Sequence, residues 1–337
     1  MYFFGRDPVV SVLLLLASTM TAGEQRPAGK PTEAGRDALQ ETRRRSATLQ
    51  SEGKVEEGIH TLAEGIQMAR HQGEAPGEIA RALNDLGTFY QDMYRLPEAL
   101  RCYEEAIALM TKCCTSSPGI VVVLNNIGRL RLIETRYAEA EKTYREAERL
   151  ASRPDGSDTS GLTQSWLGLA EVYLSTNRHS EAQALAEKTL RQLTNSDYEA
   201  SGTALFLLSR VASSRRKYEQ AEHSLRQALQ SWRASIGSTH PSYAAGLASL
   251  AMLLSRKRPA EAERLFMEAL EIVEANLGRN HYYYAQMALQ YSAHLQSHGR
   301  KKEGRALMEW AKAIAAEQGL RNRTGFTVDV QALRERE

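Results

Sequence analysis

Residues 83–109 read LNDLGTFYQDMYRLPEALRCYEEAIAL, and this stretch predicts two helices that pack against each other. Apolar and small residues recur here at the spacing of one helical face, at Leu83, Leu86, Gly87 and Tyr90. Pro97 suits the first turn of a helix but not its interior, so a second helix begins near it. The small residues Gly87 and Ala99 allow the two helices to approach closely. The stretch therefore predicts a helical hairpin.

The hairpin pattern recurs along the chain. One small residue opens the apolar face of each second helix, at Gly58, Ala99, Ala140, Ala182, Ala221, Ala262 and Gly304. A hairpin of this kind cannot bury its apolar face alone, so neighbouring copies must stack on one another. The recurrence predicts about seven hairpins in one continuous array, in which each unit contacts its neighbours.

The residues that repeat resemble a known family. The order Leu-x-x-Leu-Gly-x-x-Tyr followed by Ala-x-x-x-Tyr-x-x-Ala is similar to the tetratricopeptide repeat, whose period is about 34 residues. The longer hairpins, with joining segments such as 235–251 and 276–286, resemble the kinesin light chain subtype. The resemblance covers roughly residues 42–316. It implies an all-α fold, an α-solenoid of about seven hairpins wound as a right-handed superhelix.

The first 22 residues have the pattern of an export signal. Their apolar core, Val9–Ala17, follows one arginine and precedes small residues, which is typical of a secretory signal peptide. A helix that spans a membrane needs about 20 apolar residues, which is more than this core provides. We therefore expect residues 1–22 to be a signal peptide and the protein to be exported, periplasmic or secreted. Anchoring in a membrane by an uncleaved segment is the alternative.

Composition divides the rest of the chain. Residues 23–38 are rich in glycine, proline and charge, which predicts a flexible linker, and the solenoid is expected over 39–318. The tail, 319–337, contains a short β-prone run at Phe326–Val330. We expect this run to fold back on the last helix as an extended segment, with disorder as the alternative.

Neither the charge balance nor any motif predicts catalysis. Lys and Arg number 43 against 41 Asp and Glu, and a net charge of +2 gives no general attraction to nucleic acid or an anionic membrane. His294 and His298 have the i, i+4 spacing of zinc helices but no third ligand beside them. The three cysteines lie in one hairpin without further metal-ligating residues nearby. We expect a protein that is not an enzyme and that has no cofactor and no metal.

The resemblance implies where a partner would bind. In the tetratricopeptide repeat family, peptide ligands lie in the concave groove formed by the first helix of each hairpin. The motif places three positions of each first helix in that groove. The positions chosen as binding residues are Arg81, Asn84, Thr88, Asn125, Arg129, Gln164, Glu171, Phe206, Arg210, Met252 and Gln286. The same count reaches Val122, Leu167, Thr203, Ala245, Ala248, Leu289 and Ala293.

Two asparagines stand out among these positions. An Asn side chain offers a donor and an acceptor together, so Asn84 and Asn125 are suited to hold a peptide backbone. Kinesin light chain repeats are similar in using groove asparagines. The alternative is that both side chains bond to neighbouring backbone. The first half of the groove is polar and the second half is apolar, which suits an extended segment with one polar and one apolar end.

The sequence therefore predicts a non-enzymatic scaffold that binds a peptide or protein segment in the concave groove. The partners expected are proteins, with no nucleic acid and no membrane contact beyond the export signal. The alternative is a structural or oligomerising solenoid, or a regulatory subunit of an enzyme complex, without a peptide groove of its own.

Overall fold

The computed structural model describes residues 33–113, 118–152, 159–193 and 197–334. Within these ranges the chain forms fourteen α-helices and no strand. In chain order the helices are α1 Glu33–Ser51, α2 Val55–His71, α3 Pro76–Asp92, α4 Leu96–Cys113, α5 Pro118–Ile133, α6 Tyr137–Ala151, α7 Thr159–Ser175, α8 His179–Gln192, α9 Tyr198–Ser214, α10 Tyr218–Ser235, α11 Pro241–Leu254, α12 Pro259–Leu277, α13 Tyr282–Ser297 and α14 Lys301–Arg334.

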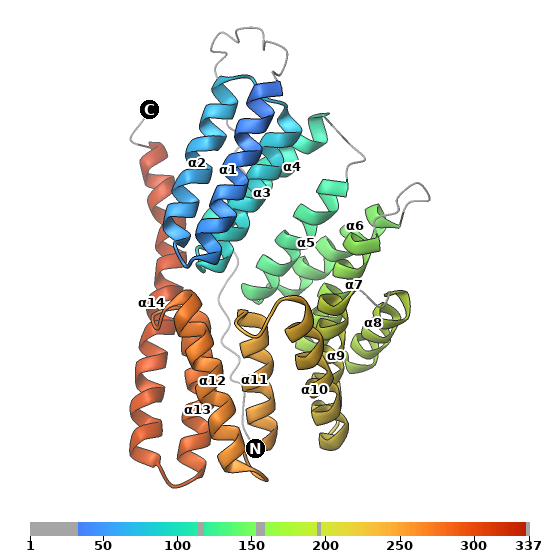
Figure 1. The fold of residues 1–337 in the computed structure, drawn as a ribbon, viewed down its shortest axis with the longest axis vertical. Helices are drawn as coiled ribbons and strands as arrows, with labels where there is room; N and C mark the ends of the chain where they lie inside the picture. Colours follow the sequence, from blue (N-terminus) through green and yellow to red (C-terminus); the bar gives the residue numbers. More distant parts are fainter. Residues whose placement is uncertain (1–32, 114–117, 153–158, 194–196, 335–337) are drawn as a thin grey trace.

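The helices pair as seven antiparallel hairpins that stack side by side (Figure 1). Each odd-numbered helix, here called a first helix, packs on the even-numbered second helix that follows it. First helices also contact the first helices of neighbouring hairpins, as α3 contacts α5 and α5 contacts α7. The predicted all-α solenoid of seven hairpins is confirmed.

Most first helices end in the same tight turn. One residue adopts the left-handed conformation, and the backbone N–H after it donates to a carbonyl five residues back, as Arg95 donates to Tyr90 at 2.8 Å. The left-handed residues are Gly53, Tyr94, Thr135, Asn177, Arg216 and Gly299. The turn between α11 and α12 has no such residue, which agrees with a sequence that is one residue shorter there.

Tyrosine rings fill the space that glycines leave between helices. A Cβ atom added to Gly87 would lie 2.6 Å from the Tyr103 ring. Tyr144 of α6 is buried with its ring against both Gly128 of α5 and Gly168 of α7, where an added Cβ would lie 2.8 Å and 2.2 Å from it. A single tyrosine thus sets the distance between two successive first helices.

The two ends of the chain depart from the expectations. Helix α1 begins at Glu33, inside the segment predicted as a linker. The prediction of an extended segment at Phe326–Val330 is wrong, because α14 continues as helix to Arg334. Extending an existing helix adds one hydrogen bond per residue without a new nucleation step, which outweighs the weak β-preference of this run. The predicted signal, 1–22, lies outside the described residues, so export stays a prediction.

The array curves until its seventh hairpin contacts its second (Figure 1). The ring of Tyr94, in the turn between α3 and α4, stacks on the ring of Tyr282 at a centroid distance of 4.1 Å. Tyr282 opens α13, yet it packs against the apolar core of the first six helices. We call the contact of these two turns the closing contact.

Two hydrogen bonds join the same parts of the chain. The Nε2 atom of His281 lies 2.8 Å from the carbonyl oxygen of Asp92. Farther along α14, Oδ1 of Asn322 accepts from the backbone N–H of Leu96 at 3.1 Å. Leu96 is the first residue of α4, whose N–H has no partner within its own helix, so Asn322 caps α4 from the far end of the chain.

We expect Gly168→Ala to lower the free energy of unfolding by about 1–3 kcal/mol, because the new methyl group overlaps the buried Tyr144 ring. Chemical denaturation followed by circular dichroism measures this change. Gly319→Ala in α14 is the matched control. Nothing lies within 4 Å of the Cβ position there, so the variant should be as stable as the wild type or more stable by roughly 0.5–1 kcal/mol. Equal stability of all three proteins would contradict the packing described.

We expect Tyr94→Gly to open the closing contact, although glycine suits the backbone φ of 57° better than tyrosine does. The lost ring stack should increase hydrogen exchange at residues 280–284. Thr135→Gly is the control, since Thr135 has a φ of 60° at the same place in the next hairpin and stacks on no ring. Unchanged exchange in Tyr94→Gly would show that the stack does not hold the two hairpins together.

Candidate functional site

The predicted groove positions fall into two classes. The first and third positions of each first helix are exposed or half-buried on all six helices from α3 to α13. These accessible residues are Arg81, Thr88, Val122, Arg129, Gln164, Glu171, Thr203, Arg210, Ala245, Met252, Gln286 and Ala293. The middle positions are less accessible and are Asn84, Asn125, Leu167, Phe206, Ala248 and Leu289. The surface that a partner can reach therefore consists of two rows of side chains, one from the first positions and one from the third positions. We call these the double row, and the middle positions lie beneath it.

Asn125 belongs to the packing between hairpins. Its side chain is 5% exposed, and its Nδ2 donates to the carbonyl oxygen of Gly161 at 3.0 Å. Its Oδ1 accepts from the hydroxyl of Ser165 at 2.9 Å. Both ends of the amide are thus bonded to α7, as in the alternative in which the asparagine bonds neighbouring backbone. We leave Asn125 out of the surface that a partner could contact.

Asn84 is also engaged by the next hairpin. Its Oδ1 accepts from Nδ2 of Asn126 at 2.9 Å. Two further pairs one repeat apart, Arg43–Asp85 at 2.6 Å and Gln50–Asp92 at 3.0 Å, join α1 to α3. Polar side chains at the repeat period therefore tie successive first helices together.

The second half of the predicted groove combines one ion pair with aromatic rings. Arg210 of α9 donates to Glu171 of α7 at 3.0 Å, and its guanidinium lies 5.9 Å from the centre of the Phe206 ring. The Phe206 ring packs on Trp232 at a centroid distance of 5.4 Å. Phe206 is half-buried, so its apolar face serves the core as well as the groove.

Arg129 is the accessible cation nearest to the closing contact. Its side chain is 55% exposed, and one guanidinium nitrogen lies 4.0 Å from Oδ1 of Asp92. Burial raises the pKa of Asp92, and the charge of Arg129 opposes this shift. Burial likewise raises the pKa of Tyr283, with Arg129 again opposing and Glu171 adding to the rise. Residues of α3 and α13 therefore lie near this arginine of α5, across the curve of the array.

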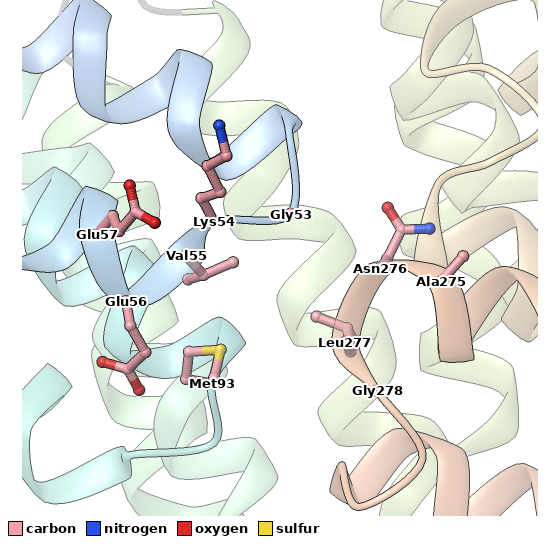
Figure 2. Close-up of a pocket in the computed structure, with 10 residues that line it drawn as sticks. All are labelled: Gly53, Lys54, Val55, Glu56, Glu57, Met93, Ala275, Asn276, Leu277 and Gly278. Carbon is pink, nitrogen blue, oxygen red and sulfur yellow. The ribbon is translucent and has the colours of Figure 1, made fainter.

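A cleft of about 340 Å³ lies beside the closing contact. Figure 2 shows Lys54, Glu56 and the apolar Val55 on one side and Asn276 and Leu277 on the other. Val55 and Leu277 project toward each other across the gap. The cleft separates the turn after α1 from the turn after α12, so the array closes at its second hairpin and stays open at its first.

The histidine pair predicted to be structural has protein partners. The Nδ1 atom of His294 lies 2.8 Å from the hydroxyl of Ser255, and the Nδ1 atom of His298 lies 2.8 Å from the carbonyl oxygen of His294. The two rings lie 4.4 Å apart. Among the residues that the structure describes, no three His, Cys, Asp or Glu side chains form a group that could hold a metal ion.

The closing contact is the feature that the sequence did not predict. Its residues come from Asp92–Tyr94 and His281–Tyr283, which are almost 190 residues apart in the chain. One local signal was present: Tyr94 is the only aromatic residue at this left-handed position, which the other first-helix turns of the described chain fill with Gly53, Thr135, Asn177, Arg216 or Gly299. The run Tyr282–Tyr284 was a second signal.

His281 has the electrostatics of a neutral, buried cap. Its Nδ1 accepts the backbone N–H of Tyr283 at 3.2 Å, so the proton of the neutral ring is on Nε2 and is donated to the carbonyl of Asp92. Burial lowers the pKa of His281 from its ordinary value of 6.5, and the bond to Asp92 only partly opposes this. Above pH 6.5 the ring is neutral in both the folded and the unfolded chain. Below pH 6.5 the unfolded chain binds the proton more strongly than the folded chain does. The free energy of unfolding therefore decreases as the pH is lowered.

We expect the free energy of unfolding to decrease from about pH 7 to pH 5, and His281→Asn to make this decrease smaller. Asparagine keeps an acceptor for the N-cap and does not titrate. His223→Asn is the control, because His223 is exposed and makes no hydrogen bond or ion pair within the described ranges. Denaturation at a series of pH values measures the slope. Identical slopes for the wild type and His281→Asn would contradict the buried neutral state.

Comparisons with known proteins agree with the geometry. The tetratricopeptide repeat model matches four overlapping ranges, 78–153, 119–195, 161–234 and 201–272, which together span more than half of the chain. In a comparison of the chain with curated protein sequences, none matches. No helix within the described residues is both long enough and apolar enough to cross a membrane.

Solved structures of similar fold include BtubC (BKLC) from P. vanneervenii, 25% identical over 67% of this chain and 92% of that one, with a TM-score of 0.49. A putative kinesin light chain of Podosopora anserina is 20% identical over 60% of this chain and 97% of that one, with a TM-score of 0.42. The Rap conjugation gene regulator of plasmid pLS20, bound to the Phr* peptide, is 13% identical over 90% of this chain and 97% of that one, with a TM-score of 0.57.

The predicted repeat family is therefore confirmed, both by the repeat model and by the stacked hairpins. Arrays of such repeats are scaffolds for interactions between proteins. The chain belongs to the tetratricopeptide repeat family.

Proposed function

We propose that this protein is a non-enzymatic scaffold that binds an extended segment of another protein along its first helices. The observation that carries the proposal is the double row of accessible side chains, present on all six first helices from α3 to α13. An extended strand of partner could contact these rows hairpin by hairpin. The Rap regulator, which shares the fold, was solved with a bound peptide.

The chemistry of the row changes along the array. Arg81 and Arg129 place exposed cations on α3 and α5, which favours acidic or polar residues in that part of the partner. Met252 on α11 is exposed, and Ala245 and Ala293 add small apolar surface on α11 and α13. The partner segment we propose therefore has a polar or acidic end and an apolar end.

Glutamine amides replace the bonded asparagines as candidates to hold the partner backbone. Gln164 on α7 is exposed, and its side chain makes no hydrogen bond within the part of the chain that the structure describes. Gln286 on α13 is exposed and donates to the hydroxyl of Tyr282 at 2.7 Å, which leaves its oxygen available. Either amide can pair with a peptide group of an extended segment.

We expect Met252→Glu to weaken binding of a peptide at least tenfold, because it puts a charge where the apolar end of the peptide would lie. The peptide is selected from a displayed random library against the wild-type protein, and its affinity is measured by calorimetry. Met267→Glu is a close control. Met267 is 49% exposed against 47% for Met252, but it lies on the second helix α12.

The control should bind the selected peptide with wild-type affinity. Equal loss in both variants would indicate a general effect of added negative charge, and loss only in Met267→Glu would move the site to the second helices. Either outcome would contradict the proposed surface. Selection of no peptide at all would favour the structural or oligomerising solenoid.

A further inference from the structure

The turns inside the last three hairpins carry an unusual concentration of cations. Three consecutive basic residues stand at each of these turns, at 215–217, at 256–258 and at 300–302, the last of which runs into the first turn of α14. The corresponding turns of the first four hairpins have one basic residue each, Lys54, Arg95, Arg136 and Arg178. The net charge of +2 averages over this asymmetry and conceals it.

The three basic turns lie next to one another along one edge of the array. Arg258, in the second of these turns, bonds Glu222 near the start of α10, and Arg300, in the third, bonds Glu263 near the start of α12. Figure 1 shows the turns that lead from α9 to α10, α11 to α12 and α13 to α14 at the same end of the molecule. We call this surface the basic edge.

One arginine in each basic turn already has a structural role. Arg258 and Arg300 each pair with a glutamate three residues later as well as with the preceding hairpin, and Arg215 bonds Gln183 and Ser180 of α8. Six cations remain, all exposed and without a side-chain hydrogen bond or ion pair in the described part of the chain. They are Arg216, Lys217, Arg256, Lys257, Lys301 and Lys302.

Several of these cations oppose the local stability of the fold. Lys217 is the N-cap of α10, and Lys301 and Lys302 form the first turn of α14, where the helix dipole repels positive charge. Arg216 has a φ of 60°, a conformation that glycine or asparagine adopts at lower cost. Stability therefore does not explain the cations, whereas an anionic partner would.

We propose that the basic edge binds the anionic surface of a lipid membrane, independently of the concave surface. The six cations lie in or directly beside three turns at one end of the molecule. Exposed charges gathered at one end fit a flat anionic surface, which attracts Lys and Arg additively and requires no shape complementarity. The exposed Tyr218, beside Lys217, suits the interfacial region of a bilayer.

A nucleic acid fits this edge less well. Proteins that hold single strands use a groove lined by several aromatic side chains, and Tyr218 is the only aromatic residue in or directly beside the three basic turns. The attraction expected from the membrane is about fivefold in affinity per Lys or Arg near the surface, so six cations are sufficient for measurable binding.

The test is flotation of the full chain with lipid vesicles. One set contains phosphatidylcholine alone, and in the other about a third of the lipid is phosphatidylserine. We expect binding only to the anionic vesicles, and its loss at about 0.5 M salt, where charges are screened. Replacing all six free cations with glutamine should weaken binding at least about 100-fold.

The matched control removes the same number of charges from second helices. It replaces Lys112, Lys142, Arg149, Arg191, Arg233 and Arg264 with glutamine, and all six are exposed. Its binding should stay within about threefold of the wild type. A third variant, Arg216→Lys with Arg256→Lys, keeps the charge and should bind as the wild type does. Circular dichroism checks that each variant is folded.

Three outcomes would overturn the proposal. The first is no binding of the wild type to anionic vesicles at low salt, and the second is equal loss in the edge variant and the control. The third is that a short RNA or a polyglutamate peptide displaces the protein from vesicles and itself binds more tightly through the six cations. None of these measurements depends on a peptide bound along the first helices, so the proposed function is tested separately.

Discussion

The contact of the Tyr144 ring with two glycines sets the geometry on which the middle of the array depends. The ring lies against Gly128 in its own hairpin and Gly168 in the next one, at distances that leave no room for a side chain on either. One residue thereby fixes both the packing within a hairpin and the step to its neighbour. Because protein interiors are close-packed, a step of fixed size repeated along the array produces a fixed curvature.

Hydrogen-bonded polar pairs also join successive hairpins elsewhere in the array. Arg43 donates to Asp85 in the next hairpin, and Asn126 donates to Asn84 in the preceding one, so both pairs join residues that are one repeat apart. On the second helices, Arg178 bonds both Glu181 in its own hairpin and Glu141 in the preceding one. Exposed pairs of this kind add little stability individually, and their main effect is to keep neighbouring hairpins in register.

The sequence predicts local structure well because repeats are local. Gly87, Ala99 and Pro97 were enough to predict the hairpin, and its recurrence predicted the array, since each unit contacts only its neighbours. The accessible first and third positions of each first helix followed from the same count. The middle positions did not, because a residue such as Asn125 is assigned to groove or packing by the offset between two helices, which a motif does not specify.

The closing contact could not be predicted, because it is a long-range contact and not a local one. It depends on the accumulated curvature of the four hairpins between the second and the seventh, and a small change per step would separate Tyr94 from Tyr282 by many ångströms. The contact of α14 with α4 could not be predicted either, because Asn322 reaches Leu96 only through the curvature of the whole array. The sequence therefore specifies the unit and its repetition, while long-range contacts emerge from their sum.

The closing contact also determines how a partner could reach the inner surface. A ring stack contributes about 0.5–1.5 kcal/mol and a hydrogen bond a similar amount, so the stack and the bonds of His281 and Asn322 together hold the array closed by about 1.5–4.5 kcal/mol. An array that opens at this cost spends on the order of 0.05–8% of its time open. For a partner segment that can enter only the open array, the affinity is multiplied by the open fraction. A segment that can bind beside Arg129 in the closed array has no such loss. The rigidity that the Tyr144 packing gives to the step between the third and fourth hairpins is thus coupled, through the curvature, to access along the first helices.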